Sequence, residues 1–236
     1  MTILSMPDEP GFRAVRFGLH TNTRTHTSPL TGKVQVQELQ GARWVASFSL
    51  PPMPRSTARR WAAFLLRLRG HVGEFYAGDP LGQESLALAK LNAEQPAAPT
   101  FDNTLITFDS DLVTFDAGVF TSLGTPVVNG ASQTGSSLVT DGWTPDVTVA
   151  LTGDYIAFDT PSGKRELHMV VEDAVSDSSG NATLTIEPPL RESPADDEAI
   201  IIEKTTCVMR LAEQDVGWDA DTIALFGITF NAVEAL

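Results

Sequence analysis

Apolar and polar residues alternate along two stretches near the N-terminus. Residues 33–39 read Lys-Val-Gln-Val-Gln-Glu-Leu, and residues 44–50 again place an apolar residue at every second position. A period of two is the pattern of a strand with one buried face. The Gln-Gly pair at 40–41 between the stretches is typical of a tight turn. The pattern predicts an antiparallel hairpin, which the prolines at 51–54 end because proline has no N–H for a neighbouring strand.

The next stretch has the spacing of an amphipathic helix over residues 57–69. Its large apolar residues fall at i, i+3, i+4 and i+7, which is one face of a helix: Trp61, Phe64, Leu65 and Leu68. Most of its arginines fall outside that face. Ser56 is the expected N-cap, and Gly70 is the expected residue after the last turn, since glycine adopts a left-handed backbone without steric cost.

A linker and a repeat are predicted after this helix. Residues 81–99 are rich in Ala, Leu, Gln and Pro, which suits a short helix or arm leading into a linker. A seven-residue repeat follows over 100–120, and each unit begins Thr-Phe-Asp. Its apolar spacing would also suit a coiled coil. However, Thr, Phe, Ile and Val favour strands, and Asp-Asn and Ser-Asp favour turns. We therefore expect short strands or β-arcs in an exposed extension.

From about residue 127 to residue 203 the chain has the sequence pattern of an all-β module. Short apolar runs alternate with turns rich in Gly, Asp, Ser and Pro; the runs are 147–151, 155–158, 167–171, 182–186 and 199–203. The Asp-Ser-Ser-Gly-Asn sequence at 177–181 is typical of a hairpin tip. So many short strands in so few residues predict a small β-barrel, either OB-like or galectin-like.

The C-terminal residues are strand-like again and are expected to return to the first sheet. The predicted fold class is therefore mainly β: a β-sandwich with one helix and an extended arm, plus an inserted small β-barrel. The predicted divisions are 1–99 for the N-terminal sandwich with helix and arm, 100–126 for the repeat-bearing extension, 127–204 for the inserted module and 205–236 for the returning strands.

Charge is distributed unevenly along the chain, whose formal net charge is −14. Residues 1–70 carry a net charge of +7, and residues 71–236 carry −21. The overall acidity argues against nonspecific nucleic-acid binding. The two halves are either unlike solvated surfaces or opposite poles that help identical subunits associate head to tail around a ring. Charge alone does not decide between these interpretations.

The single cysteine and the lack of long apolar runs suggest a protein that assembles in a reducing cytoplasm. Cys207 by itself excludes an intrachain disulfide framework and a zinc site with several cysteines. The longest apolar stretches, such as residues 61–66, are far shorter than the roughly 18 residues needed to cross a bilayer, so no membrane partner is expected. Residues 1–12 lack the basic and apolar regions of a secretory signal.

No pattern in the chain matches a known catalytic, cofactor or metal motif. The sequence GASQTG at 130–135 is one residue longer than a G-x-S-x-G elbow and lies among turn residues. Neither a Walker A loop nor a dinucleotide fingerprint is present. His20 and His26 do not have the spacing of a helical metal pair, and the acidic clusters do not match an EF-hand. We therefore predict no enzyme, no cofactor and no metal, while a hydrolase with an unrecognised site stays an alternative.

The aromatic residues of the middle module raise the possibility of glycan binding. Trp143, Tyr155 and Phe158 are able to form a stacking platform for a sugar. Tyr155 and Phe158 are expected to fill the barrel instead. Trp143 lies beside a glycine in a turn and is the candidate for exposure and for glycan binding. Trp44 and Trp61 lie on stripes that are expected to face a core.

Several short sequence segments along the chain resemble segments of one family of viral proteins. They are SPLTG at 28–32, GARWVASFSLPP at 41–52, WAAFL at 61–65, LRG at 68–70, GEFY at 73–76, VGWD at 216–219 and FNAVEAL at 230–236. They resemble the distal tail proteins found at the tail tips of siphophages and of gene transfer agents. The segments 128–135 and 181–191 resemble the β module inserted in such proteins. The resemblance covers most of the chain but rests on no single diagnostic motif.

The resemblance implies a structural role in the virion. It implies a hexameric ring that joins the tail tube protein to the baseplate hub protein, assembled in the host cytoplasm and located at the tail tip. DNA is implied only as cargo passing through the central channel. Two alternatives stay open: a carbohydrate-binding module that attaches to a host surface glycan, and a tail tube subunit. The long inserted module argues against the second, because tube subunits stack closely.

Overall fold

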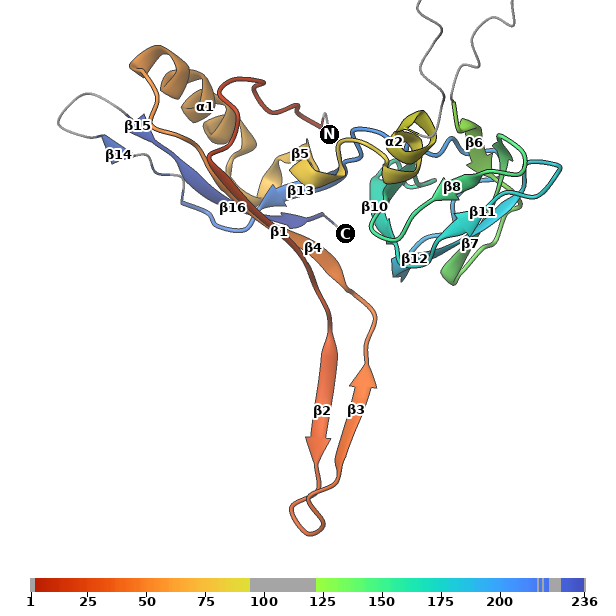
Figure 1. Ribbon diagram of the computed structural model, residues 1–236. Helices are drawn as coiled ribbons and strands as arrows, with labels where there is room; N and C mark the ends of the chain where they lie inside the picture. The colour runs from red at the N-terminus through yellow and green to blue at the C-terminus, as the bar shows by residue number, and fades with distance from the viewer. Residues whose placement is uncertain (1–2, 94–121, 216, 218, 221–225, 236) are drawn as a thin grey trace, which may run out of the picture.

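The computed structural model describes residues 3–93, 122–215, 217, 219–220 and 226–235. Within them the protein is mainly β, as predicted, with two five-stranded sheets in two bodies that lie side by side (Figure 1). The seven-residue repeat over 100–120 lies outside the described residues.

The first sheet is built from both ends of the chain. Its strands run antiparallel in the order β1-β4-β16-β13-β5. β1 (Ala14–His20), β4 (Arg43–Ser49) and β5 (Glu74–Ala77) precede the second body, whereas β13 (Cys207–Leu211) and β16 (Thr229–Glu234) follow it. The two late strands lie in the middle of the sheet. The second body is therefore an insertion between β5 and β13.

Helix α1 (Arg55–Leu68) packs on one face of this sheet and forms the first core. Its buried residues are Ala58 and the predicted apolar stripe of Trp61, Phe64, Leu65 and Leu68. The Phe64 ring meets Phe75 of β5 edge to face with centroids 5.7 Å apart, and the Trp61 ring lies 6.1 Å from Phe230 of β16. The helix thus joins a strand from the N-terminal part of the sheet to one from the C-terminal part.

The start of α1 differs from the prediction, whereas Gly70 follows the last turn as predicted. Pro54, with φ −68° and ψ 156°, occupies the N-cap position, and no side chain caps the helix there. Ser56 is therefore wrong as the N-cap and lies inside the first turn. The fixed φ of proline suits the extended N-cap conformation, so the helix begins directly after the proline run. Arg69 takes the left-handed conformation at the other end with φ 52°, and Gly70 follows it with φ 67°.

The hairpin predicted from residues 33–39 and 44–50 is wrong. β4 pairs with β1 from Ala14↔Ser49 to His20↔Arg43, and β3 (Val34–Glu38) pairs with β2 (Thr23–Thr27). Every residue of β2 and β3 is exposed, so this stretch is not half-buried. Alternation along a strand shows that its two faces differ, but it does not show what covers the apolar face.

The second body is a curled sheet in the order β6-β7-β12-β10-β9 (Figure 1). Its strands are β6 (Gly124–Val128), β7 (Gly135–Trp143), β9 (Tyr155–Asp159), β10 (Arg165–Val170) and β12 (Ala182–Leu190). β8 (Thr148–Ala150) pairs with β11 (Ala174–Val175) in a short second sheet. Four of the five predicted apolar runs contribute to these strands, whereas 199–203 makes only isolated bridges to β6 and β9. None of the predicted apolar runs covers β7, because most of its residues are polar or glycine.

Short elements connect the two bodies and complete the fold. Two single 3-10 turns, η1 (Gly70–Val72) and η2 (Pro80–Gly82), flank β5, and α2 (Leu86–Ala93) follows them. Asp154 of the second body accepts hydrogen bonds from the backbone N–H groups of Leu86 and Ala87, which fixes the start of α2 on that body. β14 (Asp219–Ala220) pairs with β15 (Phe226–Gly227) near α1.

Candidate assembly surfaces

A two-stranded ribbon stands off the first sheet (Figure 1). It consists of β2 and β3, which continue β1 and β4 beyond the sheet, and we call residues 21–42 the arm. Side chains of residues paired across a ribbon lie on the same face. One face of the arm carries β-branched residues and one acid: Thr23, Thr25, Thr27, Val34, Val36 and Glu38. The opposite face is polar and basic: Arg24, His26, Gln35 and Gln37.

The β-branched face of the arm is uncovered. Val34 is 59% exposed, Val36 is 62% exposed, and Leu30 at the tip is 95% exposed. A two-stranded ribbon is at best marginally stable in water without a surface to pack on. Exposed apolar side chains gathered on one face mark a protein interaction site. The uncovered face of the arm is therefore a candidate surface for contact with another protein.

Hydrogen bonds hold both ends of the arm in place. At the tip the N–H of Ser28 donates to the Lys33 carbonyl at 2.9 Å, and the N–H of Gly32 donates to the Ser28 carbonyl at 2.9 Å. At the base the Asn22 side chain donates to the Gln40 carbonyl at 3.0 Å. Gly32 has φ 64°, a conformation that glycine adopts without steric cost. These bonds connect the two strands of the arm at its tip and at its base.

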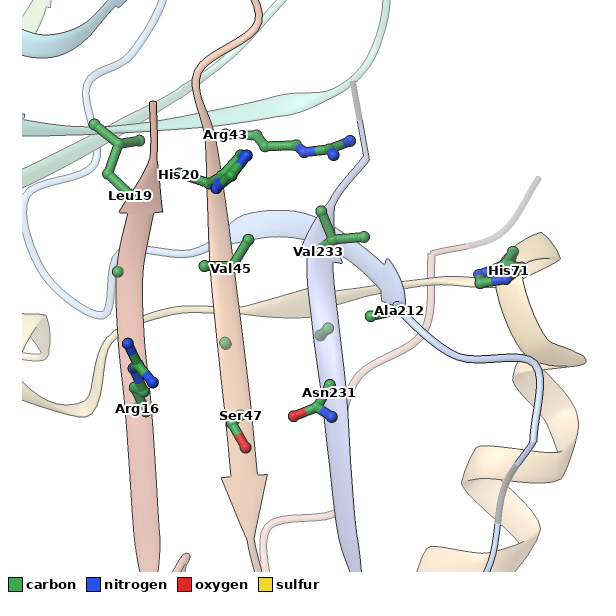
Figure 2. Close-up of a pocket in the computed structure, with 13 residues that line it drawn as sticks. Arg16, Leu19, His20, Arg43, Val45, Ser47, His71, Ala212, Asn231 and Val233 are labelled. Atoms are coloured by element: carbon green, nitrogen blue, oxygen red, sulfur yellow. The ribbon is translucent and has the colours of Figure 1, made fainter. Parts of the chain in front are cut away.

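The face of the first sheet that α1 leaves open forms a basic concavity. Its volume is about 690 Å³, and it is lined from β1, β4 and β16. Figure 2 shows Arg16 near one end and the His20–Arg43 pair at the other, with Val45 and Val233 between them. No acidic residue lines it. Its charge has the same sign as Arg24 and Lys33 of the arm, so a neighbour's arm is not the partner that this concavity favours.

Aromatic side chains form the junction between the two bodies. The Trp44 Nε1–H of β4 donates to the Leu167 carbonyl of β10 at 2.7 Å, and its ring lies 5.8 Å from the Tyr155 ring of β9. The Tyr155 hydroxyl donates to Asp79 at 2.9 Å, and burial together with this carboxylate raises the pKa of Tyr155. A Cβ on Gly82 would overlap the Tyr155 ring. Glycine at this position is therefore required for the close approach of η2.

An ion pair at this junction is largely removed from water. Arg191, at the end of β12, donates from both terminal nitrogens to Glu234 of β16 at 2.9 and 2.7 Å. Glu234 is buried and also accepts from the Trp44 N–H at 2.9 Å. Burial raises the pKa of Glu234, while Arg191 and the Trp44 N–H act in the opposite direction. The pair joins the inserted module to the strands on either side of it in sequence.

His168 of β10 lies near this ion pair, since Glu166 is close to both His168 and Arg191. Its Nδ1 is 2.7 Å from the Pro188 carbonyl, which only accepts, so Nδ1 carries the hydrogen. Its Nε2 is 3.3 Å from Glu166 Oε2, and neither atom has a hydrogen-bond partner among the described residues. The ring stacks on Phe158 with centroids 5.1 Å apart. His168 is fully buried, so it forms part of the junction and not of an open site.

Trp143 is not exposed, which corrects the expectation that it offers a glycan platform. It is 3% exposed within the second core, and its Nε1–H donates to the Thr140 hydroxyl at 2.7 Å. A Cβ on its neighbour Gly142 would overlap the Thr125 carbonyl oxygen, so β7 and β6 lie very close at this point. Tyr155 and Phe158 are also buried, as are Trp44 and Trp61 on their predicted stripes.

Replacing Trp143 with alanine should destabilise the protein. The change removes a buried indole and a buried hydrogen bond, and such substitutions lower the free energy of unfolding by about 3–5 kcal/mol. Trp143→Phe keeps an aromatic ring and should cost clearly less. Calorimetric melting of both variants measures the difference. Unchanged melting of Trp143→Ala would mean that the indole is not part of the core.

The described residues contain no group of three or more His, Cys, Asp or Glu side chains that is able to hold a metal ion. Neither α-helix in the described ranges is long and apolar enough to span a membrane. Cys207 lies fully buried in β13, where burial raises the pKa of its thiol. No known protein family matches the chain, and no curated protein is similar to it in sequence.

The sequence did not identify the residues of these surfaces. Thr-Arg-Thr-His-Thr at 23–27 alternates as strictly as 33–39 does, and that alternation was the available signal for the arm. Nothing in the local sequence pairs Arg191 with Glu234, because the two residues meet only through the tertiary fold.

Proposed function

We propose that the chain is a structural virion protein of a phage tail tip, and that six copies close into a ring joining the tail tube to the baseplate hub. The observation that carries the proposal is the arm. Its β-branched face is uncovered, and its two strands extend away from the first sheet. A surface of this kind suits a neighbouring subunit.

The positions in the fold of the segments that resemble distal tail proteins support the proposal. The segment at 41–52 contains β4, and the segment at 230–236 overlaps β16. These two strands pair directly with each other near the base of the arm. The segment at 73–76 overlaps β5 of the same sheet. Residues that resemble distal tail proteins therefore gather in the sheet that bears the arm, although they are far apart in sequence.

An open sheet edge also suits a ring. β1 is an edge strand of the first sheet, whereas the opposite edge, β5, is partly covered by Leu4, whose N–H donates to the Glu74 carbonyl at 2.9 Å. Proteins usually pair or cover exposed strand edges. Neighbouring copies in a closed ring cover the β1 edge and the arm of every subunit. The glycan alternative has lost its candidate residue, since Trp143 is buried.

Mass photometry of the purified full-length chain tests the ring. We expect a species of six copies, and antibody labelling of assembled tails should mark the end of the tube that meets the hub. A three- or twelve-copy species, or a chain that stays monomeric alone and within tails, would contradict the proposal. Labelling along the whole tube would identify a tube subunit instead.

A further inference from the structure

The outer face of α1 is strongly basic and has no partner in the described structure. Its exposed cations are Arg55, Arg59, Arg60, Arg67 and, at the cap, Arg69. The helix contains no Asp or Glu, and no carboxylate among the described side chains lies within 4.0 Å of these arginines. Like charges at i and i+4, such as Arg55 and Arg59, destabilise a helix. Leu66 stands among them and is 59% exposed.

The inserted module has the opposite character, because it directs its own cations towards the first sheet. Residues 122–203 contain three basic residues, Lys164, Arg165 and Arg191. Lys164 lies 3.7 Å from Glu74 of β5, the Arg165 guanidinium lies 5.1 Å from the centre of the Tyr76 ring, and Arg191 pairs with Glu234. All three cations therefore contact residues of the first sheet. The charged residues on the outer surface of the module are consequently acidic.

These acids gather with exposed valines around β11. Residues 171–177 expose Glu172, Asp173 and Asp177 together with Val171 and Val175, and Val175 is 62% exposed. Hydrogen bonds from the N–H and the hydroxyl of Thr152, and to a smaller extent the charge of Lys90 in α2, lower the pKa of Asp173. We call residues 171–177 the acidic edge. It combines acids with apolar side chains, as the α1 face combines arginines with Leu66.

The two surfaces lie at opposite ends of one subunit. Figure 1 shows α1 at the end of the first sheet that is distant from the module, whereas β11 lies on the outer side of the module. They are therefore unable to meet within one copy. Two different patches at opposite ends form a head-to-tail contact between copies, and such contacts close into rings when the rotation permits.

We infer that the arginine face of α1 binds the acidic edge of the inserted module of the next copy in the ring. This inference rests on the ring proposed above and names one of its contacts. Duplex DNA is the other polyanion that an arginine face attracts. It is disfavoured because residues 71–236 carry a net charge of −21 and repel it. The exposed Leu66 and Val175 also suit a protein contact, whose centre is apolar.

Charge reversal in the full-length chain tests this contact. The helix variant carries Arg59→Glu, Arg60→Glu and Arg67→Glu, and the edge variant carries Glu172→Lys, Asp173→Lys and Val175→Lys. Each variant alone should assemble about 100-fold less well than the wild type, because like charges then face each other at every contact. An equimolar mixture should recover assembly, since alternating variants restore opposite charges at each contact of a ring with an even number of subunits.

The control is Lys204→Glu, which reverses an exposed cation that lies on neither surface and outside the arm. It should assemble like the wild type, and thermal melting should show that all variants fold. Two variants that each form normal rings, or a mixture that stays dissociated, would overturn the contact and leave the ring intact. A wild-type chain that is monomeric both at low salt and within assembled tails would contradict the ring itself. If the helix variant loses binding to a short DNA duplex but still assembles like the wild type, the arginines bind DNA. That result would also overturn the contact.

Discussion

The variant Val34→Asp with Val36→Asp should fold normally and lose ring assembly. Both valines are exposed in the isolated chain, so their replacement removes no contact of the fold. Burying a valine side chain contributes about 1.5–3 kcal/mol. Loss of two such side chains weakens each subunit contact by about 100-fold or more, since every 1.4 kcal/mol is about a tenfold change. Mass photometry should therefore show monomers at concentrations where the wild type forms rings.

The opposite face of the same strand provides the control. Gln35→Asp with Gln37→Asp introduces the same charges one position away, on the polar face of the arm. We expect this variant to keep ring assembly with little change. Equal loss of assembly in both variants would show that the arm acts through its charge and not through its β-branched face. Normal assembly of the valine variant would remove the arm from the interface.

Replacing Arg191 with alanine should lower the free energy of unfolding by about 3–5 kcal/mol. The substitution leaves the Glu234 carboxylate buried without a counter-ion, which is the costly outcome when a buried ion pair is broken. It also removes the Arg191 Nε hydrogen bond to the Ala42 carbonyl, at 3.2 Å. Because Arg191 joins the module to β16 and β4, we expect the bodies to melt separately in a calorimeter.

Two further variants separate charge from packing at the junction. Asp159→Asn breaks the Arg165–Asp159 pair, which is more exposed, and should cost about 1 kcal/mol or less. The double variant Arg191→Met with Glu234→Gln removes both charges and should recover part of the loss, since no unpaired charge stays buried. An Arg191→Ala variant with wild-type melting would show that the pair does not hold the bodies together.

Helix α1 shows what the sequence predicts well. Its apolar residues repeat with the period of a helix, and a helix with one such stripe buries that stripe whatever its neighbours are. The same four large residues are buried in the fold. Its start was misplaced by two residues, because the proline at position 54 defines the start and no side-chain cap is present.

The arm shows what a local pattern leaves undetermined. Residues 33–39 form a strand over most of their length, as predicted, but the partner strand is β2 and not β4. The choice between partners depends on the register of β1 with β4, which is set by contacts across the whole sheet. Exposure of the arm is likewise a property of the tertiary fold, since the same alternation would serve a half-buried strand.

Trp143 was misjudged because a glycine neighbour suggested an open turn. Trp143 is instead the last residue of β7, and its indole packs among the buried residues of the second core. The positive φ of Gly142 lets the backbone approach β6 closely at this point. The Arg191–Glu234 pair was not predictable by pattern, because 43 residues separate its partners and only the return of the chain to the first sheet unites them.

A cryo-electron microscopy reconstruction of an assembled tail tip tests the central claim most directly. The proposal predicts six copies of the chain in one ring between tube and hub, with the Val34–Val36 face of each arm buried against another subunit. Threefold or twelvefold symmetry, or six copies whose arms stay exposed to solvent, would contradict it.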